Sequence, residues 1–274
     1  SAKILFQKAS SLNPKNPFAL AGMGKVALVN NDRNAESDYF DRARRADKTN
    51  PEVYCSIAEG CMNRSRQDTT TALLFINQGL NINQKYSNLH LATGNLETLK
   101  KEYGLAANAY DRAIFFDSKS YIAYRNRGYI DYLSRSYQDA LKAFNKSIEI
   151  LPEQILIYKY LGDLYYAAGK YSEAEKAYQT YLARAEITTD DKERYAITMF
   201  FNKKYNEAAS LLEQVLAVNH DESVLLRIRG YIAYETGDFQ KGLAYMNNFF
   251  ALHHPKKLIS TDYSYYAKIL QKIG

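Results

Sequence analysis

Cationic and aromatic side chains recur in this sequence at multiples of 34 residues. Lys159 follows Arg125 after 34 residues, and Arg227 follows Lys159 after twice that interval. A tyrosine stands seven residues after each cation, at Tyr132, Tyr166 and Tyr234. On a helix, residues seven positions apart lie on one face. Because Arg and Lys form charge-assisted hydrogen bonds with carboxylates and tyrosine offers amphipathic contact area, the pattern predicts binding of a segment that carries carboxylates.

The residues that metal sites and catalytic centres need are not placed together. No second ligand stands at helical spacing from any of the four histidines, His90, His220, His253 and His254. Cys55 and Cys61 would lie about 9 Å apart along one helix, too far for a disulfide, so we predict two buried thiols. Phosphate-binding, dinucleotide-binding and nucleophile-elbow motifs are also missing. We therefore expect no enzyme, no cofactor and no metal.

Composition indicates long helices. The 274 residues include only 13 Gly and 5 Pro, while 46% are apolar. A β-sandwich or barrel needs turn residues roughly every 8 to 12 positions, and this chain has too few of them. The net charge is +6, but the basic residues are interspersed with acids, as on a mixed solvated surface. No apolar run approaches the 18 or so residues that a membrane-spanning helix requires.

Self-comparison at a period of 34 residues aligns most of the chain. One unit and the next share the residue pairs Tyr124 and Tyr158, Gly128 and Gly162, Tyr137 and Tyr171, Ala140 and Ala174, and Phe144 and Tyr178. Apolar residues at helical spacing predict two helices and a short turn in each unit. We expect Gly or Ala at position 8 to face small residues at positions 20 and 27, with a large side chain at 24 beyond them. Ser172 and Glu175 predict a capping box that opens one second helix.

This pattern resembles the tetratricopeptide repeat over essentially the whole chain. The resemblance implies an all-α, right-handed superhelical solenoid of antiparallel helix hairpins. It divides the chain into one array: the second helix of a truncated unit at 1–16, repeats at 17–50, 51–86, 87–120, 121–154, 155–188, 189–222 and 223–259, and a capping helix at 260–274. Because the array starts with a second helix, we expect further sequence upstream. The last residues, 260–274, are loosely similar to envelope-associated tetratricopeptide proteins of the Bacteroides group. That similarity favours the bacterial periplasm or envelope, with the cytoplasm as the alternative.

In the family, the first helices line a concave surface that binds peptides or partner proteins. The resemblance therefore implies a monomeric protein-interaction scaffold without catalysis, whose partner is a protein or peptide with acidic groups. Positions 5, 9 and 12 of the first helices supply the predicted partner-binding residues Arg125, Tyr129, Tyr132, Lys159, Asp163, Tyr166, Phe200, Arg227, Tyr231 and Tyr234.

Three alternatives stay open for these side chains. Several of the 25 tyrosines could pack against a neighbouring hairpin instead of binding a partner. Tyrosines in a groove could also stack on sugars, as in an envelope protein for glycan uptake, although the chain has no Trp. Nucleic acid would use the same cations and aromatic rings, but Glu59, Asp163 and Glu193 on the same face argue against it.

Overall fold

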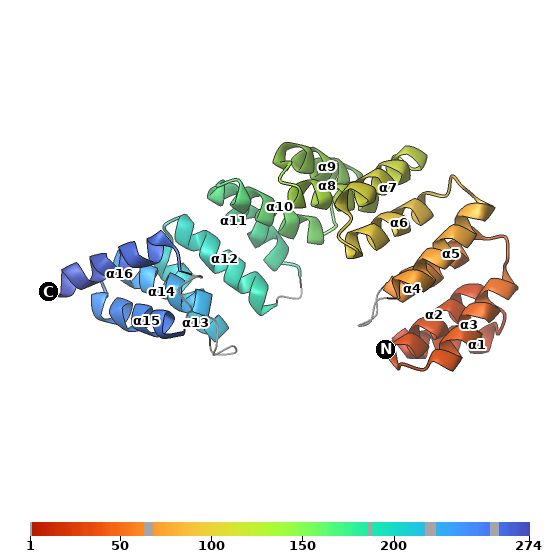
Figure 1. Cartoon of the computed structure of the whole chain (residues 1–274), viewed down its shortest axis with the longest axis horizontal. Helices are drawn as coiled ribbons and strands as arrows, with labels where there is room; N and C mark the ends of the chain where they lie inside the picture. The colour runs from red at the N-terminus through yellow and green to blue at the C-terminus, as the bar shows by residue number, and fades with distance from the viewer. Residues whose placement is uncertain (1, 63–67, 186–187, 217–222, 253–257) are drawn as a thin grey trace. The chain divides into compact units, whose positions relative to one another are not determined.

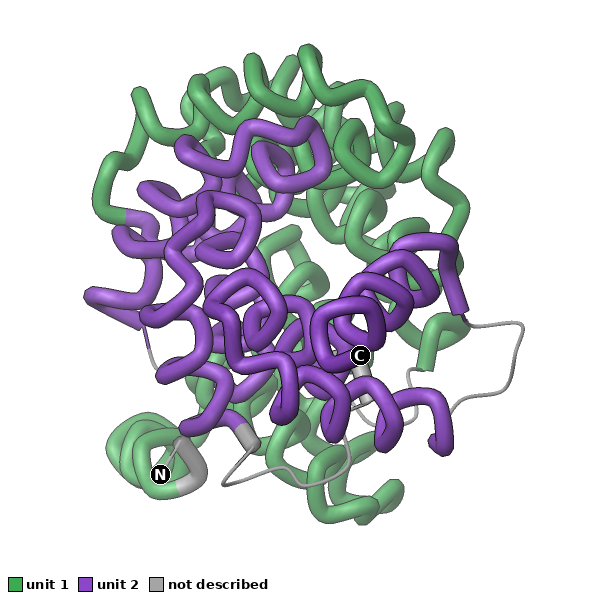
Figure 2. The backbone as a smooth tube through the Cα atoms, turned by 90° about the vertical axis from the view of Figure 1, so that its left-hand side faces the viewer, with its two compact units in different colours: residues 1–153 green, residues 154–274 purple. Residues whose placement is uncertain are grey.

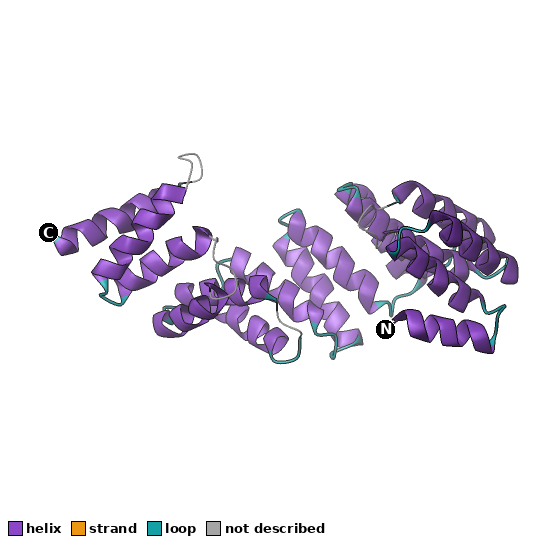
Figure 3. Ribbon diagram, turned by 90° about the horizontal axis from the view of Figure 1, so that it is seen from below, coloured by secondary structure: helices purple, strands orange, loops and turns teal. Residues whose placement is uncertain are grey.

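The computed structural model describes residues 2–62, 68–185, 188–216, 223–252 and 258–274, which form helices and turns without a strand (Figure 1). The predicted all-α fold of antiparallel helix hairpins is therefore confirmed in this part of the chain. The residues form two compact units, 1–153 and 154–274 (Figure 2). Short described turns join helices within the hairpins, for example at 30–32 and 168–170, and Figure 3 colours such loops teal.

The first unit consists of one leading helix and four hairpins. Its helices are α1 (Ala2–Leu12), α2 (Pro17–Val29), α3 (Arg33–Ala46), α4 (Pro51–Met62), α5 (Thr69–Ile82), α6 (Ser87–Leu99), α7 (Tyr103–Phe116), α8 (Tyr121–Leu133) and α9 (Tyr137–Ile150). The pairs α2/α3, α4/α5, α6/α7 and α8/α9 pack as hairpins, and each of α2, α4 and α6 also contacts the next first helix. These first helices form the first-helix face of unit 1.

The second unit consists of three hairpins and a closing helix. Its helices are α10 (Leu156–Ala167), α11 (Tyr171–Leu182), α12 (Thr189–Phe201), α13 (Tyr205–Leu216), α14 (Ser223–Glu235), α15 (Phe239–Leu252) and α16 (Ser260–Ile273). The hairpins are α10/α11, α12/α13 and α14/α15, and α14 also packs against α12 and α16. Helices α10, α12, α14 and α16 form the first-helix face of unit 2.

Each predicted repeat encloses one observed hairpin. Repeat 155–188, for example, contains α10 and α11, and segment 260–274 contains α16. Along the sequence, the boundary between the two compact units, at 153/154, falls one residue before the boundary between the fourth and fifth predicted repeats. The continuity of one array across this junction stays a prediction.

Glycine at position 8 accommodates the large side chain of position 24. A Cβ on Gly162 would lie 2.5 Å from the Tyr178 ring, and one on Gly128 would lie 2.7 Å from the Phe144 ring. The large side chain thus lies directly against the glycine, closer than the small residues that the sequence predicted there. A methyl group at these glycines would force the two helices apart.

In every hairpin whose turn the structure describes, which leaves out α4/α5, a residue in the left-handed region stands at position 15. Glycine occupies this position at Gly169 (φ 72°) and Gly237 (φ 83°), but Lys101 (φ 63°), Arg135 (φ 61°) and Lys203 (φ 61°) occupy it elsewhere. A side chain with a Cβ is strained there by roughly 1 kcal/mol. The sequence pattern did not reveal this requirement, because only some of these residues are glycines.

The predicted capping box at Ser172 and Glu175 is wrong. Helix α11 begins at Tyr171 after Lys170, which makes no side-chain capping bond, so Ser172 lies inside the first turn. Glu175 is buried and accepts hydrogen bonds from Lys204 Nζ (2.6 Å) and Asn202 Nδ2 (2.7 Å) in the turn between α12 and α13. The carboxylate therefore joins two hairpins instead of capping its own helix.

Candidate functional site

Two adjoining cavities lie on the first-helix face of unit 2. The first has a volume of about 370 Å³ and is lined by Tyr166, Tyr178, Asp190, Glu193, Arg194 and Ile197. The second, of about 470 Å³, is lined by Tyr166, Ile197, Phe200, Phe201, Lys203, Tyr205, Arg227, Ile228, Tyr231, Ile259, Thr261 and Tyr265. Because Tyr166 and Ile197 line both, the cavities form one groove, with α12 as the wall that they share. We call it the α12 groove.

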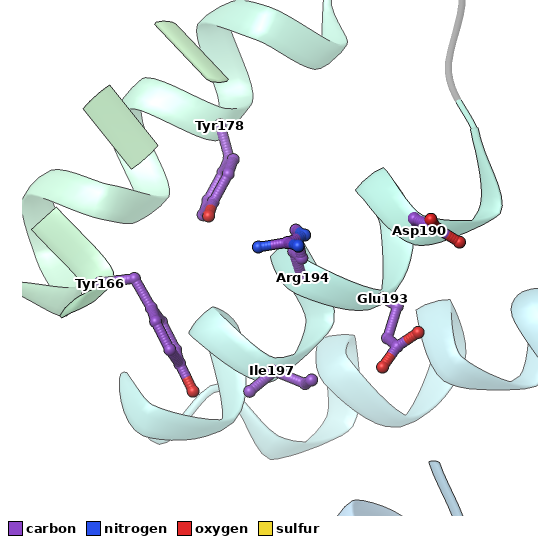
Figure 4. A pocket seen from close by; sticks show the side chains of 6 residues that line it. All are labelled: Tyr166, Tyr178, Asp190, Glu193, Arg194 and Ile197. Atoms are coloured by element: carbon purple, nitrogen blue, oxygen red, sulfur yellow. The ribbon is translucent and has the colours of Figure 1, made fainter. Parts of the chain in front are cut away.

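A capping box fixes the start of α12 and so the side of the helix that faces the groove. Thr188 Oγ1 accepts from the Asp191 backbone N–H, and the Asp191 carboxylate accepts from the Thr188 N–H at 3.1 Å. Helical spacing then places Glu193, Ile197 and Phe200 along one side. Figure 4 shows Tyr166 and Tyr178 across the first cavity from Asp190 and Glu193, with Arg194 between them.

An ion pair between Asp163 and Arg194, supported by a tyrosine, links two first helices in the first cavity. Tyr178 on α11 donates a hydrogen bond to Asp163 on α10 at 2.6 Å, and Arg194 Nη1 on α12 lies 3.1 Å from the same carboxylate oxygen. The Arg194 side chain is 56% exposed, whereas that of Asp163 is 12% exposed. The arrangement holds Arg194 across the cavity while leaving much of its guanidinium in contact with solvent.

The second cavity has aromatic walls that already stack on one another. Tyr231 lies parallel to Tyr265 with ring centroids 4.0 Å apart, and Tyr171 stacks on Phe201 at 4.6 Å. Tyr166 meets the Phe201 ring edge-on at 5.8 Å. These contacts hold the rings against one another; Tyr231 is 4% exposed, whereas Phe201 is 41% exposed.

Lys159 pairs with a buried carboxylate of the next first helix. Its ammonium lies 2.6 Å from Asp191 Oδ1, and the Asp191 side chain is only 2% exposed. Burial by itself would raise the pKa of Asp191, but the hydrogen bonds from Lys159 and Thr188 outweigh it and lower that pKa below its usual value. Burial likewise opposes the charge on Lys159, yet the bond to Asp191 leaves its pKa raised. Lys159 therefore joins α10 to α12.

Arg227 makes the same kind of pair one hairpin later. Its Nε lies 2.7 Å from Asp262 Oδ1, and its Nη2 donates to Asp262 Oδ2 at 3.0 Å. Asp262 is fully buried and also accepts from the Tyr231 hydroxyl and from the Ile259 N–H. Burial and the bond to Asp262 raise the pKa of Tyr231. Arg227 further lies over the Phe249 ring at 4.8 Å, so it ties α14 to α15 and α16.

Asp191 and Asp262, the carboxylates of these two ion pairs, both stand at repeat position 3. Every other first helix has a buried apolar residue at this position. Those apolar residues are Ala19, Val53, Leu89, Ala123, Ile157 and Leu225. In unit 2, two of the predicted cations thus make ion pairs inside the chain. Tyr234 also packs within the unit, against Tyr265 at 5.5 Å and Phe239 at 5.8 Å.

The predicted residues of unit 1 make a separate set of contacts. Both Arg125 Nε and Nη2 donate to Asn126 Oδ1 at 3.2 Å, and Asn126 Nδ2 donates to Asn95 Oδ1 at 2.9 Å. Tyr129 stacks on Tyr132 with centroids 6.3 Å apart. The α8 side chains Arg125, Asn126, Tyr129 and Tyr132 are half-buried on the first-helix face of unit 1.

Four predicted residues, Tyr166, Phe200, Arg227 and Tyr231, line the α12 groove, and Asp163 holds its Arg194. The prediction omitted Asp190 and Thr261 at position 2 and Arg194, Ile228 and Tyr265 at position 6. Counting positions 2 and 6 along with 5, 9 and 12 would have found them, because all five face the same side of a helix. Binding by these residues stays a prediction.

The described residues contain no cluster of three or more His, Cys, Asp or Glu that could hold a metal ion. His90 is buried, stacks on Phe116 and lies 2.8 Å from the Gln84 carbonyl oxygen, and burial lowers its pKa. His220, His253 and His254 lie outside the described residues. Cys55 and Cys61 form no disulfide and are buried, which confirms the prediction for both thiols. Among the helices of these ranges, none combines the length and apolarity needed to cross a membrane.

Residues 100–155 and 158–197 match the tetratricopeptide repeat family. No curated protein matches the sequence. Among solved structures, Pseudomonas aeruginosa pilF is 17% identical with a TM-score of 0.66, covering 81% of this chain and 97% of its own. A tetratricopeptide repeat protein from Parabacteroides merdae is 16% identical (TM-score 0.57; 93% and 99% covered). The protein YrrB, described as having an unusual peptide-binding site, is 16% identical (TM-score 0.61; 72% and 97% covered). At these identities, the likeness shows the fold.

Proposed function

Because the chain has the tetratricopeptide-repeat fold and carries this family's repeats in residues 100–197, we propose that it is a scaffold that binds a segment of a partner protein. The site is the α12 groove of unit 2. The protein performs no catalysis and uses no cofactor in this role. Repeats of this kind present a broad surface of side chains on rigid helices, which suits recognition of extended partners.

The α12 groove is the observation that carries the proposal. Its cavities of about 370 and 470 Å³ are within the range of ligand sites in proteins. The second cavity is lined mainly by aromatic and aliphatic side chains, which dominate the energetics of protein interfaces. YrrB, which has a similar fold, is described as a peptide-binding protein, and we extend that mode of binding to this chain as part of the proposal.

A second contact surface is proposed on unit 1, around Arg125, Tyr129 and Tyr132. The expectation of an acidic partner rested on Arg125, Lys159 and Arg227. Lys159 and Arg227 already pair with Asp191 and Asp262, so we assign an acidic group of the partner to Arg125. The remaining predicted residues hold the helices and side chains of the groove in place: Lys159 pairs with Asp191, Asp163 with Arg194, and Tyr234 packs against Tyr265.

Glycan binding is the alternative, and the stacking of the tyrosines weighs against it. Sugars bind to exposed ring faces, but Tyr231 is 4% exposed and lies against Tyr265. A protein segment needs apolar surface and hydrogen-bond partners, and the groove offers both.

Site-specific photo-crosslinking tests the proposal. Benzoylphenylalanine is placed at Thr261, an exposed residue of the groove, or at Lys142, an exposed residue of the second helix α9. In cells of the source organism, the probe at Thr261 is expected to trap a defined partner protein that the probe at Lys142 does not trap. The same proteins trapped from both positions, or none from Thr261, would contradict the proposal.

A further inference from the structure

The charges along α12 change sign from one end of the groove to the other. Asp190 and Glu193 line the groove near the start of α12, and Lys203 lines it just beyond the end. The other two cations of the groove are offset inside the chain, Arg194 by Asp163 and Arg227 by Asp262. The groove therefore has a negative end and a positive end.

Apolar side chains occupy the space between these ends. Ile197 belongs to both cavities, and Phe200, Phe201 and Tyr231 continue the wall toward Lys203. From Asp190 to Phe201 the helix rises about 17 Å, the length of roughly five residues of extended peptide, and Lys203 lies just beyond its end. One short segment can thus contact both charged ends and the apolar centre together.

We propose that the α12 groove selects a segment of a partner protein with an aromatic or large aliphatic anchor, a basic residue on its Asp190 and Glu193 side and an acidic residue on its Lys203 side. This inference rests on the proposed function and adds the chemistry of the segment. The anchor enters the aromatic cavity, where burial of apolar area drives binding. The flanking charges orient the segment and exclude segments with like charge at either end.

Labelled peptides test this charge order on the full chain. Fluorescein-labelled nine-residue peptides share a central Phe-Leu pair and carry two Lys on one side and two Glu on the other, Lys on both sides, or Glu on both sides. Fluorescence anisotropy is expected to show the mixed peptide binding about three- to fivefold more tightly than either single-sign peptide, as for exposed charge pairs. A mixed peptide with Ser-Ser in place of Phe-Leu is expected not to bind. Equal binding of all peptides overturns the inference.

Matched variants assign the two ends. The double variant Asp190→Asn with Glu193→Gln is expected to lower the affinity for the mixed peptide about threefold. Glu173→Gln, on the exposed side of α11, is expected to leave this affinity unchanged. Lys203→Gly removes the ammonium at a left-handed residue where glycine is favoured, so the fold is preserved. It is expected to weaken the same peptide, while Lys101→Gly at the equivalent turn of unit 1 has no effect. Loss of affinity in both members of a pair, or in neither, overturns the assignment.

The outcome also separates this inference from the proposed function. If Thr261 crosslinks a defined partner but the peptides show no charge preference, the charge order is wrong and the scaffold role stands. If neither the crosslinks nor the peptides engage the groove, both fail. Displacement of the mixed peptide by a chito-oligosaccharide would overturn both in favour of glycan binding.

Discussion

At three matching repeat positions, the two units build one arrangement from different residues. In unit 1, Tyr110 donates to Asn95 at 2.9 Å, and Asn126 of the next first helix donates to the same oxygen. In unit 2, Tyr178 donates to Asp163, and Arg194 takes the place of the second asparagine. The tyrosine at position 24 thus holds a bridge between first helices in both units, neutral in one and charged in the other. The repeat frame fixes the geometry of this bridge. The residue types at positions 9 and 6 can differ from unit to unit, and they set the charge that the surface offers for binding.

The units differ in the same way at positions 5 and 3. In unit 2, Lys159 and Arg227 reach buried aspartates on the following first helix. In unit 1, the residues at position 3 are apolar, and Arg125 bonds instead to its neighbour Asn126. A cation at position 5 is therefore structural where an acid faces it, as at Lys159 and Arg227; that Arg125 binds a ligand is part of the proposal. Four changes sharpen or break this contrast, in order of decreasing expected effect.

Asp262→Ala is expected to destabilise unit 2 by about 3–5 kcal/mol, because it leaves the largely buried Arg227 without its carboxylate and Tyr231 without its acceptor. Urea unfolding of the full chain, followed by circular dichroism, measures the change. Thr261→Ala, an exposed neighbour in the same turn, is the control, with an expected change within about 0.5 kcal/mol. Equal stability of the two variants would mean that the Arg227 pair is not structural.

Asp191→Asn is expected to lower the free energy of unfolding by a smaller amount, about 2 kcal/mol near neutral pH. The Lys159 side chain is partly exposed and can turn to solvent when its partner is lost. The lowered pKa of Asp191 also sets a pH dependence. Its stabilisation is present above the unfolded-state pKa of about 4 and is lost as the pH falls through the folded-state value. Between about pH 5 and pH 2, the free energy of unfolding should therefore fall less steeply with decreasing pH for Asp191→Asn than for the parent chain. Identical acid profiles would contradict the role of this pair.

Gly162→Ala is expected to destabilise by about 1–2 kcal/mol, since the added methyl group would meet the Tyr178 ring. Gly104→Ala in α7 of unit 1 has open space around its Cβ and is expected to stabilise by roughly 0.5–1 kcal/mol. Thermal unfolding compares the two. Changes of the same sign would show that contact with position 24 does not govern the glycine.

Arg194→Gln gives the smallest expected effect, below about 1 kcal/mol, because the Arg194 side chain is mostly exposed. Adding salt should reduce the difference between this variant and the parent chain, as expected for a partly exposed ion pair. Asn126→Ala in unit 1 removes the neutral counterpart, so its effect should not change with salt. A salt-independent effect of Arg194→Gln would mean that the charge in the bridge is unimportant.

The 34-residue frame was sufficient to predict the hairpins, because it depends on close packing that repeats in every unit. Spacing alone predicted small residues at positions 20 and 27 against Gly128 and Gly162, whereas the structure places the Phe144 and Tyr178 rings directly against them. The capping box failed for a local reason. Helix α11 starts at Tyr171, and Glu175 is drawn to Lys204 and Asn202, 29 and 27 residues away.

The site was only partly predictable, since side chains at equivalent positions can face different partners. Tyr166 and Tyr231, which the sequence predicted for the binding face, both line the α12 groove, and their part in binding stays a prediction. The sequence pattern also grouped Lys159 and Arg227 with Arg125 as partner-binding cations. It missed their ion-pair partners, Asp191 and Asp262, because these lie 32 and 35 residues further along the chain. One signal could have separated them: an aspartate at position 3, where the repeat otherwise has an apolar residue. Arg194 was overlooked because position 6 was not counted with the exposed face.

Hydrogen exchange of the full chain with its partner bound tests the central claim most directly. If the α12 groove is the binding site, amides of α12, α14 and α16 should exchange more slowly in the complex, together with the Lys203 turn. The second helices α11, α13 and α15 should change little. Protection confined to those second helices, with α12 unchanged, would contradict the account.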